Sequence, residues 1–220
     1  MPQLELTSVV EHSLREHGYA VDRYLDKYHQ TYLDMGREIQ PDVAEWQQVW
    51  SRVAFAILSA NAPFEDSVSA LGYACRHKGQ AEGTALAKYR MTPNKAEYLN
   101  AIPLGPEVCV YTRRPGESYH EQRIRLTEVP GLALTKASFL AALLDPLHAD
   151  VACVDTHMQR VYLGRRGFQT LKLAEYLSVE SRVREVGTRH GVSTFLAQWA
   201  IWDHARGKVQ SHAVFPGGHK

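Results

Sequence analysis

The stretch with the greatest capacity for chemistry is Val129–Leu163, which holds a proline–glycine turn, a lysine and an aspartate. Pro130 and Gly131 lie between two segments that read as helices, and glycine permits the positive φ that a tight turn requires. Backbone N–H groups in such a turn, at the positive end of the next helix, can bind a DNA phosphate. Lys136 follows near the start of the second helix, and Asp155 comes later. Brought together, a lysine and an aspartate can act as nucleophile and acid–base group on a base that has left the DNA stack.

Each of these residues also has a simpler structural explanation. A Pro-Gly turn joins helices in many all-α proteins. Asp155 follows the apolar run 151–154, where it would cap a helix, a role that also fixes the direction of its carboxylate. Lys136 would be a surface lysine in a first helical turn, where the dipole disfavours a cation. Structural or core roles are also expected for two histidines and four tryptophans: His157, His204, Trp46, Trp50, Trp199 and Trp202.

Apolar residues recur at helical spacing along almost the whole chain, and strand patterns are nearly absent. The strongest helix begins after Pro41-Asp42 and becomes fully apolar towards Leu58, which predicts a buried central helix. Residues 103–115 contain several glycines and prolines and predict a loop or a short extended stretch. Further helices are predicted from Thr7 or Ser8 to about Gly18, and over about 21–35, 64–76, 92–101, 117–127, 135–144, 171–186 and 192–206. We therefore expect an all-α fold.

A chain of 220 residues is long enough for one sizeable core, or for two small lobes that share a cleft. We expect a single unit over residues 1–220 with two lobes. One lobe spans about 42–145 and includes a helical hairpin at 117–144. The other combines about 1–41 with 146–210. The tail 211–220, rich in glycine and histidine, is expected to be flexible.

The formal net charge of +1 excludes a strongly basic protein, so any positive surface for nucleic acid must be local. Arginines do gather around the Val129–Leu163 stretch, before the turn and after the aspartate: Arg113, Arg114, Arg123, Arg125, Arg160, Arg165 and Arg166. The alternative is that they lie on ordinary solvated helix faces.

Three cysteines lie far apart without a CxxC pair, a pattern that argues against a disulfide framework, a zinc site or an iron–sulfur cluster. We therefore expect no metal and no cofactor, and a reducing cytoplasmic location. Early acidic residues and the lack of an apolar core region argue against a signal peptide. No apolar run approaches the ~18 residues that span a bilayer, so we expect no association with membranes. We also expect a monomer.

Three motifs together resemble those of the helix-hairpin-helix (HhH-GPD) superfamily of DNA glycosylases, which includes endonuclease III and the 8-oxoguanine glycosylases. The run 129–132, Val-Pro-Gly-Leu, is similar to the Leu-Pro-Gly-Val hairpin of the family. The run 154–157, Val-Asp-Thr-His, followed by Arg160 and Val161, is similar to a Val-Asp-Thr-His run with a trailing Arg-Val. Upstream, the run 58–62, Leu-Ser-Ala-Asn-Ala, resembles a Leu-Ser-Ala-Gln-Ala run at the tip of a buried helix. The motifs cover roughly half of the chain.

The resemblance implies a two-lobed, all-α fold with double-stranded DNA across the cleft and the target nucleotide flipped out. Asn61 would fill the gap that the flipped base leaves. Asp155 would stabilise positive charge on the sugar or activate a nucleophile. Lys136, if it is the nucleophile, would attack the sugar carbon as a neutral amine and form a Schiff base. The DNA contacts implied by the resemblance are Asn61, Pro130, Gly131, Leu132, Ala133, Thr135 and Arg160.

The sequence departs from the family pattern in three places. Ala133 replaces the second glycine of the hairpin. Counted without gaps, the position of the family's nucleophile falls on Thr135, whereas one additional residue in the turn would bring Lys136 there. The four-cysteine cluster of endonuclease III is missing.

Parts of the same motifs, Pro-Gly-Leu with Thr-Lys-Ala-Ser-Phe and Ser-Ala-Asn-Ala-Pro-Phe, also resemble phage proteins linked to thymine hypermodification. That resemblance implies transfer of a free amino acid onto an activated 5-methyl group of a pyrimidine in DNA, in the host cytoplasm, with the glycosidic bond kept. Asp155 or Lys136 would then deprotonate the amine or contact the leaving phosphate. Three functions stay open: a DNA N-glycosylase of base excision repair, with or without lyase activity; this base transferase; and a non-enzymatic DNA-binding module.

Overall fold

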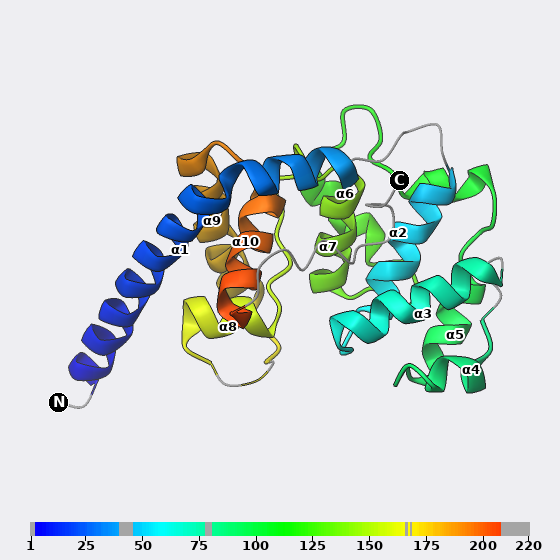
Figure 1. Ribbon diagram of the computed structural model, residues 1–220, viewed down its shortest axis with the longest axis horizontal. Helices are drawn as coiled ribbons and strands as arrows, with labels where there is room; N and C mark the ends of the chain where they lie inside the picture. Colours follow the sequence, from blue (N-terminus) through cyan, green and yellow to red (C-terminus); the bar gives the residue numbers. More distant parts are fainter. Residues whose placement is uncertain (1–2, 40–45, 78–80, 166, 168, 208–220) are drawn as a thin grey trace.

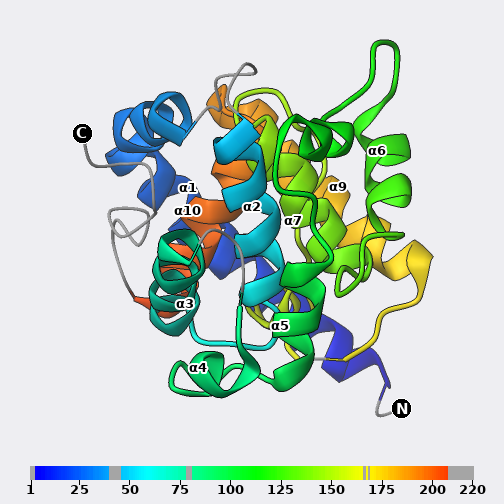
Figure 2. The same ribbon diagram turned by 90° about the vertical axis from the view of Figure 1, so that its right-hand side faces the viewer.

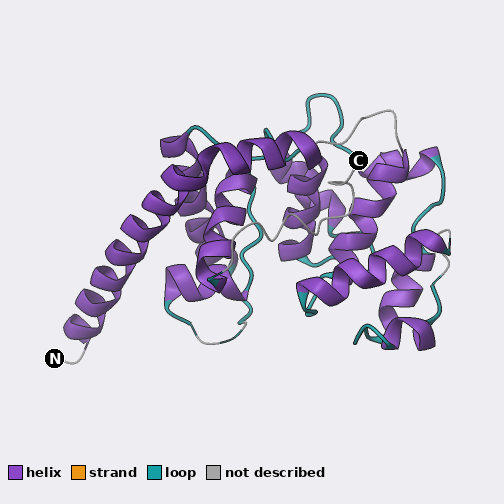
Figure 3. Ribbon diagram, viewed as in Figure 1, coloured by secondary structure: helices purple, strands orange, loops and turns teal. Residues whose placement is uncertain are grey.

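The computed structural model describes residues 3–39, 46–77, 81–165, 167 and 169–207 (Figure 1). All regular structure in these ranges is helical (Figure 3), which confirms the predicted all-α class. The elements are α1 (Gln3–Ile39), α2 (Trp46–Leu58), α3 (Phe64–Arg76), α4 (Gly83–Ala87), α5 (Pro93–Asn100), the 3-10 helix η1 (Pro106–Tyr111), α6 (Tyr119–Leu126), α7 (Leu134–Leu144), α8 (Thr156–Leu163), α9 (Leu173–His190) and α10 (Thr194–Arg206).

The helices gather into two groups (Figure 1). At one end of the molecule α10 packs against α1, α8 and α9. At the other end α2 packs against α3, α5, α7 and η1, and Figure 2 shows α2 between α3 and α7. α6 packs against α7 and lies near the middle of the molecule. The predicted limits of the two lobes, about 42–145 against 1–41 with 146–210, stay a prediction.

The predicted central helix is present as α2, in which every residue from Arg52 to Leu58 is buried. Residues 137–144 of α7 are likewise all buried. A helix that is apolar on all sides needs neighbours on all sides, so α2 and α7 form the core on which the other elements pack. Each apolar side chain fully removed from water contributes roughly 1.5–3 kcal/mol to this core.

The predicted hairpin is formed by α6 and α7. Ser118 begins α6 with a capping box, in which its hydroxyl accepts from the Glu121 N–H and the Glu121 carboxylate accepts from the Ser118 N–H. Gly131 has a φ of 86°, and a Cβ on it would lie 2.5 Å from Cδ2 of Tyr98. Both the positive φ and the close approach of the Tyr98 ring explain why glycine occupies this turn.

Several predicted helix limits are wrong. α1 is one continuous helix from Gln3, although two helices separated near Gly18 are predicted; one glycine in a helix costs only ~1 kcal/mol. α9 continues through Gly187, where a Cβ would lie 2.9 Å from the Val192 carbonyl oxygen, so this glycine allows close packing and is not a stop. The region 103–115 contains η1, and the short α4 is not predicted at all. The tail 211–220 and Arg166 lie outside the described residues.

The prediction of a basic surface before the hairpin is wrong for Arg123. Its side chain is fully buried, and Nη1 lies 2.6 Å from Oε2 of Glu180, which ties α6 to α9. Removing either partner would leave a buried charge without compensation. Arg125 donates to the Glu117 carboxylate and to two backbone carbonyls, so it braces the segment before α6.

Within the described ranges, no helix combines the length and apolar character that crossing a membrane requires. No group of three or more His, Cys, Asp or Glu side chains suited to a metal ion was found in this part of the chain.

Candidate active site

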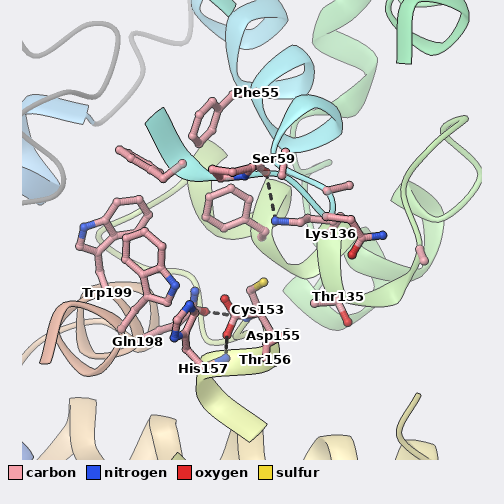
Figure 4. Close-up of a pocket in the computed structure, with 18 of the residues that line it drawn as sticks. Phe55, Ser59, Thr135, Lys136, Cys153, Asp155, Thr156, His157, Gln198 and Trp199 are labelled. Carbon is pink, nitrogen blue, oxygen red and sulfur yellow. Dashed lines mark hydrogen bonds between the residues drawn. The ribbon is translucent and has the colours of Figure 1, made fainter. Parts of the chain in front are cut away.

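A cavity of about 480 Å³ lies where the two helix groups meet (Figure 4). Its lining comes from the turn after α2 with the start of α3, from the hairpin with the start of α7, from the start of α8, and from one face of α10. Three helices, α3, α7 and α8, therefore present their N-termini to this cavity. Because the N-terminus of a helix carries partial positive charge, this arrangement favours anionic groups and disfavours cations.

Asp155 is the N-cap of α8, and its carboxylate lines the cavity. Its Oδ1 accepts hydrogen bonds from the backbone N–H groups of His157 at 2.9 Å and Met158 at 3.0 Å. The preceding run 151–154 is buried and is held to α10, since the Cys153 N–H donates to Oε1 of Gln198 at 2.6 Å. Capping and an active-site position thus coexist, because the cap fixes where the carboxylate points.

Lys136 lies in the first turn of α7, and its side chain extends into the same cavity (Figure 4). Its Nζ donates to Oγ of Ser59 at 3.0 Å and lies 4.8 Å from the ring centre of Phe139. Thr135 also lines the cavity. The structure therefore brings the Lys136 amine into the cavity with the Asp155 carboxylate, although an ungapped count gives the nucleophile position to Thr135.

The charges of Lys136 and Asp155 both act on the pKa of the Cys153 thiol. Burial raises the pKa of its thiol to about 12, while the positive charge of Lys136 acts to lower it and the negative charge of Asp155 acts to raise it. At neutral pH the thiol is therefore protonated, and a protonated thiol is a poor nucleophile.

Aromatic rings form part of the cavity wall. Trp199 stacks on Phe139 with a ring-centre distance of 6.3 Å and an interplanar angle of 9°, and Trp202 lies 5.4 Å from Trp199. Flat aromatic faces suit a planar base that has left the duplex. Trp199 is 3% exposed, as expected of a core residue, but both tryptophans also line the cavity.

His157, expected to be structural, also lines the cavity and meets Trp202 edge-on at 5.9 Å. Burial lowers the pKa of His157 below its usual 6.5, while the Asp155 charge acts to raise it. The ring is therefore neutral at pH 7. Its Nδ1 is buried, and no hydrogen-bond partner for it was found among the residues that the structure describes.

The face of α10 that lines the cavity carries Gln198, Trp202 and Arg206, at intervals of four residues. Such spacing places side chains on one side of a helix, so the sequence carries a signal for Gln198 and Arg206, although neither was predicted as a site residue. The Arg206 guanidinium lies 4.1 Å from the ring centre of Trp202, and Nη2 lies 3.5 Å from Oε1 of Glu65. Arg206 and Glu65 thus meet across the cavity from the ends of α10 and α3.

Asn61 is exposed and lines the cavity, in the turn between α2 and α3. Its φ of 51° is left-handed, a conformation that asparagine adopts more readily than most residues. The left-handed backbone fits a turn after a helix, and the exposed Asn61 amide is free to contact a ligand in the cavity.

The other predicted DNA contacts are distributed around the hairpin and α8. Pro130, Gly131 and Ala133 are exposed, and no side-chain hydrogen bond caps α7 at Ala133. Leu132 is different, because its side chain is 3% exposed and its N–H donates to the Val129 carbonyl. Arg160 is exposed on α8, outside the cavity lining.

Comparison with solved structures identifies the fold. The 8-oxoguanine DNA glycosylase of Thermotoga maritima superposes with a TM-score of 0.69 at 19% identity, covering 91% of this chain and 99% of that one. The 8-oxoguanine glycosylase/lyase of Methanocaldococcus jannaschii, in complex with a 15mer DNA containing 8-oxoguanine, gives a TM-score of 0.71 at 16% identity, covering 87% and 100%. A second structure of the M. jannaschii 8-oxoguanine DNA glycosylase gives 0.63 at 18% identity, covering 93% and 97%. No protein-family model and no curated protein sequence matches the chain.

Proposed function

Because the chain has the helical fold of helix-hairpin-helix DNA glycosylases, we propose that it is a DNA N-glycosylase with lyase activity. The observation that carries the proposal is the placement of the Lys136 amine and the Asp155 carboxylate in one cavity, at the N-termini of α7 and α8. The first candidate for the excised base is 8-oxoguanine, since the three structural relatives are described as glycosylases of that base.

In this mechanism the neutral Lys136 amine attacks the sugar carbon C1′ of the flipped nucleotide. The new C–N bond forms as the glycosidic bond breaks. The electron pair of the glycosidic bond leaves with the base, which then takes up a proton. The amine gives up its proton, and opening of the sugar ring yields a Schiff base. The Ser59 hydroxyl holds Nζ in place by accepting a hydrogen bond at 3.0 Å.

Asp155 contributes negative charge where positive charge develops on the sugar. Its two backbone hydrogen bonds fix the carboxylate before the reaction, so little reorganisation is needed at the transition state. Asn61, on the turn beside the cavity, would occupy the space that the flipped base vacates, and the hairpin N-terminus would hold a phosphate. Trp202, the half-buried ring of this aromatic wall, would stack on the extruded base.

The proposal is tested by incubating the purified protein with duplex oligonucleotides that each carry one modified base, beginning with 8-oxoguanine opposite cytosine. Mass spectrometry follows the DNA and the free base, and borohydride is added to reduce and trap a Schiff base. We expect base release and a trapped protein–DNA adduct with the wild-type chain, and no adduct with Lys136→Ala.

Other outcomes would contradict the proposal in distinct ways. Base release without an adduct would indicate a glycosylase that uses water. A gain of mass on an intact base, dependent on an added amino acid, would indicate the base transferase predicted as an alternative. Binding of DNA without any change in mass across the whole set of bases would indicate a binding module.

A further inference from the structure

Arg206, the last residue of α10, lines the cavity, and the reaction above gives it no role. Its Nη1 atom is buried, and no hydrogen-bond partner for it was found in the described part of the chain. Within the same ranges, the buried Nδ1 atom of His157 in the cavity wall also has no such partner. Most buried polar atoms of folded proteins are paired, because an unpaired one is destabilising. Two of them in the wall of one cavity indicate that a ligand supplies the missing partners.

The guanidinium group of Arg206 is held by two neighbours. Its Cζ lies 4.1 Å from the ring centre of Trp202, and Nη2 lies 3.5 Å from Oε1 of Glu65. The His157 ring meets the same indole edge-on at 5.9 Å. Both unpartnered atoms therefore belong to side chains that pack around Trp202, the ring on which the flipped base would stack.

The chemistry of a guanidinium group decides which ligand groups it can bind. Arginine carries five N–H donors and no acceptor. The Nδ1 atom of a neutral histidine donates or accepts, depending on which ring nitrogen carries the proton, so His157 does not restrict the ligand in this way. Arg206 requires an acceptor. On the edge of a nucleobase, a carbonyl oxygen is an acceptor, whereas an amino group is a donor.

We propose that Arg206 is a specificity-determining residue: its Nη1 donates to a carbonyl oxygen on the edge of the flipped base and so selects against a base that has an amino group at that place. The proposal rests on the proposed function in one respect, that a flipped base enters the cavity. It does not depend on the nucleophile or on cleavage of the glycosidic bond. 8-Oxoguanine meets the requirement, because it carries carbonyl groups at C6 and C8.

Glu65 is the neighbouring group that would act in the opposite direction. A carboxylate only accepts, so it would favour an amino group on the base. However, 57% of the Glu65 side chain is exposed, against 15% of the Arg206 side chain, and Nη1 itself is buried. A hydrogen bond shielded from water discriminates more strongly than an exposed one. We therefore expect the preference of Arg206 to dominate.

The experiment measures affinity without a chemical step. Each duplex oligonucleotide carries one 2′-fluoroarabino nucleotide, whose glycosidic bond resists cleavage, opposite cytosine. The bases form matched pairs in which one carbonyl is replaced by an amino group: 8-oxoguanine with 2,6-diamino-8-oxopurine at C6, 8-oxoguanine with 8-aminoguanine at C8, and uracil with cytosine at C4. For each pair the discrimination ratio is the Kd of the amino member divided by the Kd of the carbonyl member.

The ratio is compared between the wild-type chain, Arg206→Met, which removes every donor of the guanidinium, and Arg206→Gln, which offers both a donor and an acceptor. Differences in pairing with the opposite strand are the same for all proteins and cancel in this comparison. For the pair whose changed position faces Nη1, we expect the ratio to fall about tenfold in both variants. Urea unfolding of each variant confirms that the chain is folded.

Arg165 provides a matched control. It is also an arginine paired with a glutamate, Glu175, its side chain is 26% exposed, and it does not line the cavity. Arg165→Met removes one positive charge and can weaken binding to every oligonucleotide, but it should keep the wild-type ratios. Ratios that fall for no pair in the Arg206 variants, or that fall equally in Arg165→Met, would overturn the proposal. Ratios that rise in the Arg206 variants would also overturn it.

Base release from ordinary deoxynucleotides tests the proposed function separately. If no base is released but the ratio falls in both Arg206 variants, Arg206 selects the base for another reaction, and only the proposed function fails. If base is released and the ratios are unchanged, the proposed function stands and the role of Arg206 is refuted. Absence of binding to every oligonucleotide would overturn both proposals.

Discussion

Replacing Asp155 with asparagine separates the two tasks of this side chain, which caps α8 and supplies charge to the cavity. Asparagine has the same shape and retains an Oδ1 that can accept from the N–H groups of His157 and Met158, as the carboxylate does at 2.9 and 3.0 Å. The structural loss is then limited to the interaction between the negative charge and the dipole of α8. That interaction contributes about 0.3–1 kcal/mol, a small part of the 5–15 kcal/mol that is typical of a folded domain.

The catalytic loss should be much larger. Removing a positioned acid–base or electrostatic group lowers turnover by ~100-fold or more. A hundredfold loss corresponds to about 2.7 kcal/mol of transition-state stabilisation. Asp155→Asn should therefore remain folded and bind DNA nearly as well as the wild-type chain, while base release under single-turnover conditions falls at least ~100-fold.

The assay combines single-turnover base release, DNA affinity and urea unfolding of the same preparations. Ser118→Ala is the matched control, because Ser118 caps α6 by accepting from the Glu121 N–H at 3.2 Å and does not line the cavity. That control should lose about 1 kcal/mol of stability and keep its activity. If Asp155→Asn releases base at the wild-type rate, or slows no more than Ser118→Ala does, the reasoning is refuted and Asp155 is only a cap.

Asn61→Ala should reduce the fluorescence enhancement of 2-aminopurine placed beside the target base. Asn61→Gly removes the same amide without backbone strain, because glycine tolerates the φ of 51°. Wild-type enhancement in both variants would exclude Asn61 as the residue that fills the gap left by the flipped base. Gly131→Val should weaken binding to all DNA sequences alike and lower the unfolding free energy, because a Cβ would lie 2.5 Å from the Tyr98 ring; unchanged affinity and stability would contradict this. The hydrogen bond from Arg125 is the main reason why the pKa of the Glu117 carboxyl is lowered to about 2. The ionised Glu117 carboxylate therefore stabilises the folded state above pH 4.5, its usual pKa, and this stabilisation is lost as the pH falls towards 2. The unfolding free energy measured in urea should fall over this pH range, and in Arg125→Met it should depend less on pH.

Local sequence patterns were sufficient for the central helix, the hairpin turn and the cap on α8. The apolar run of α2 allows no exposed face, the positive φ of Gly131 belongs to the turn itself, and Asp155 caps the residues that directly follow it. These features depend on neighbours in the chain, and so a single sequence discloses them. The predicted helix end before Gly187 is wrong, because this glycine is retained for packing against a distant carbonyl.

Only the tertiary structure decided which side chains share the cavity. The register of the hairpin left Thr135 and Lys136 as alternatives, and the amine is placed by its bond to Ser59, which lies far away in the sequence. Arg123 reads as a surface cation in the sequence, yet Glu180 holds it in the core. Lys95, a buried cation on α5, likewise gains its place from the carbonyls of Leu58 and Ala60 at and just after the end of α2. The physical reason is the same in each case: burial and pairing of a charge depend on groups that folding brings together from distant parts of the chain, and periodicity within one segment carries no information about them.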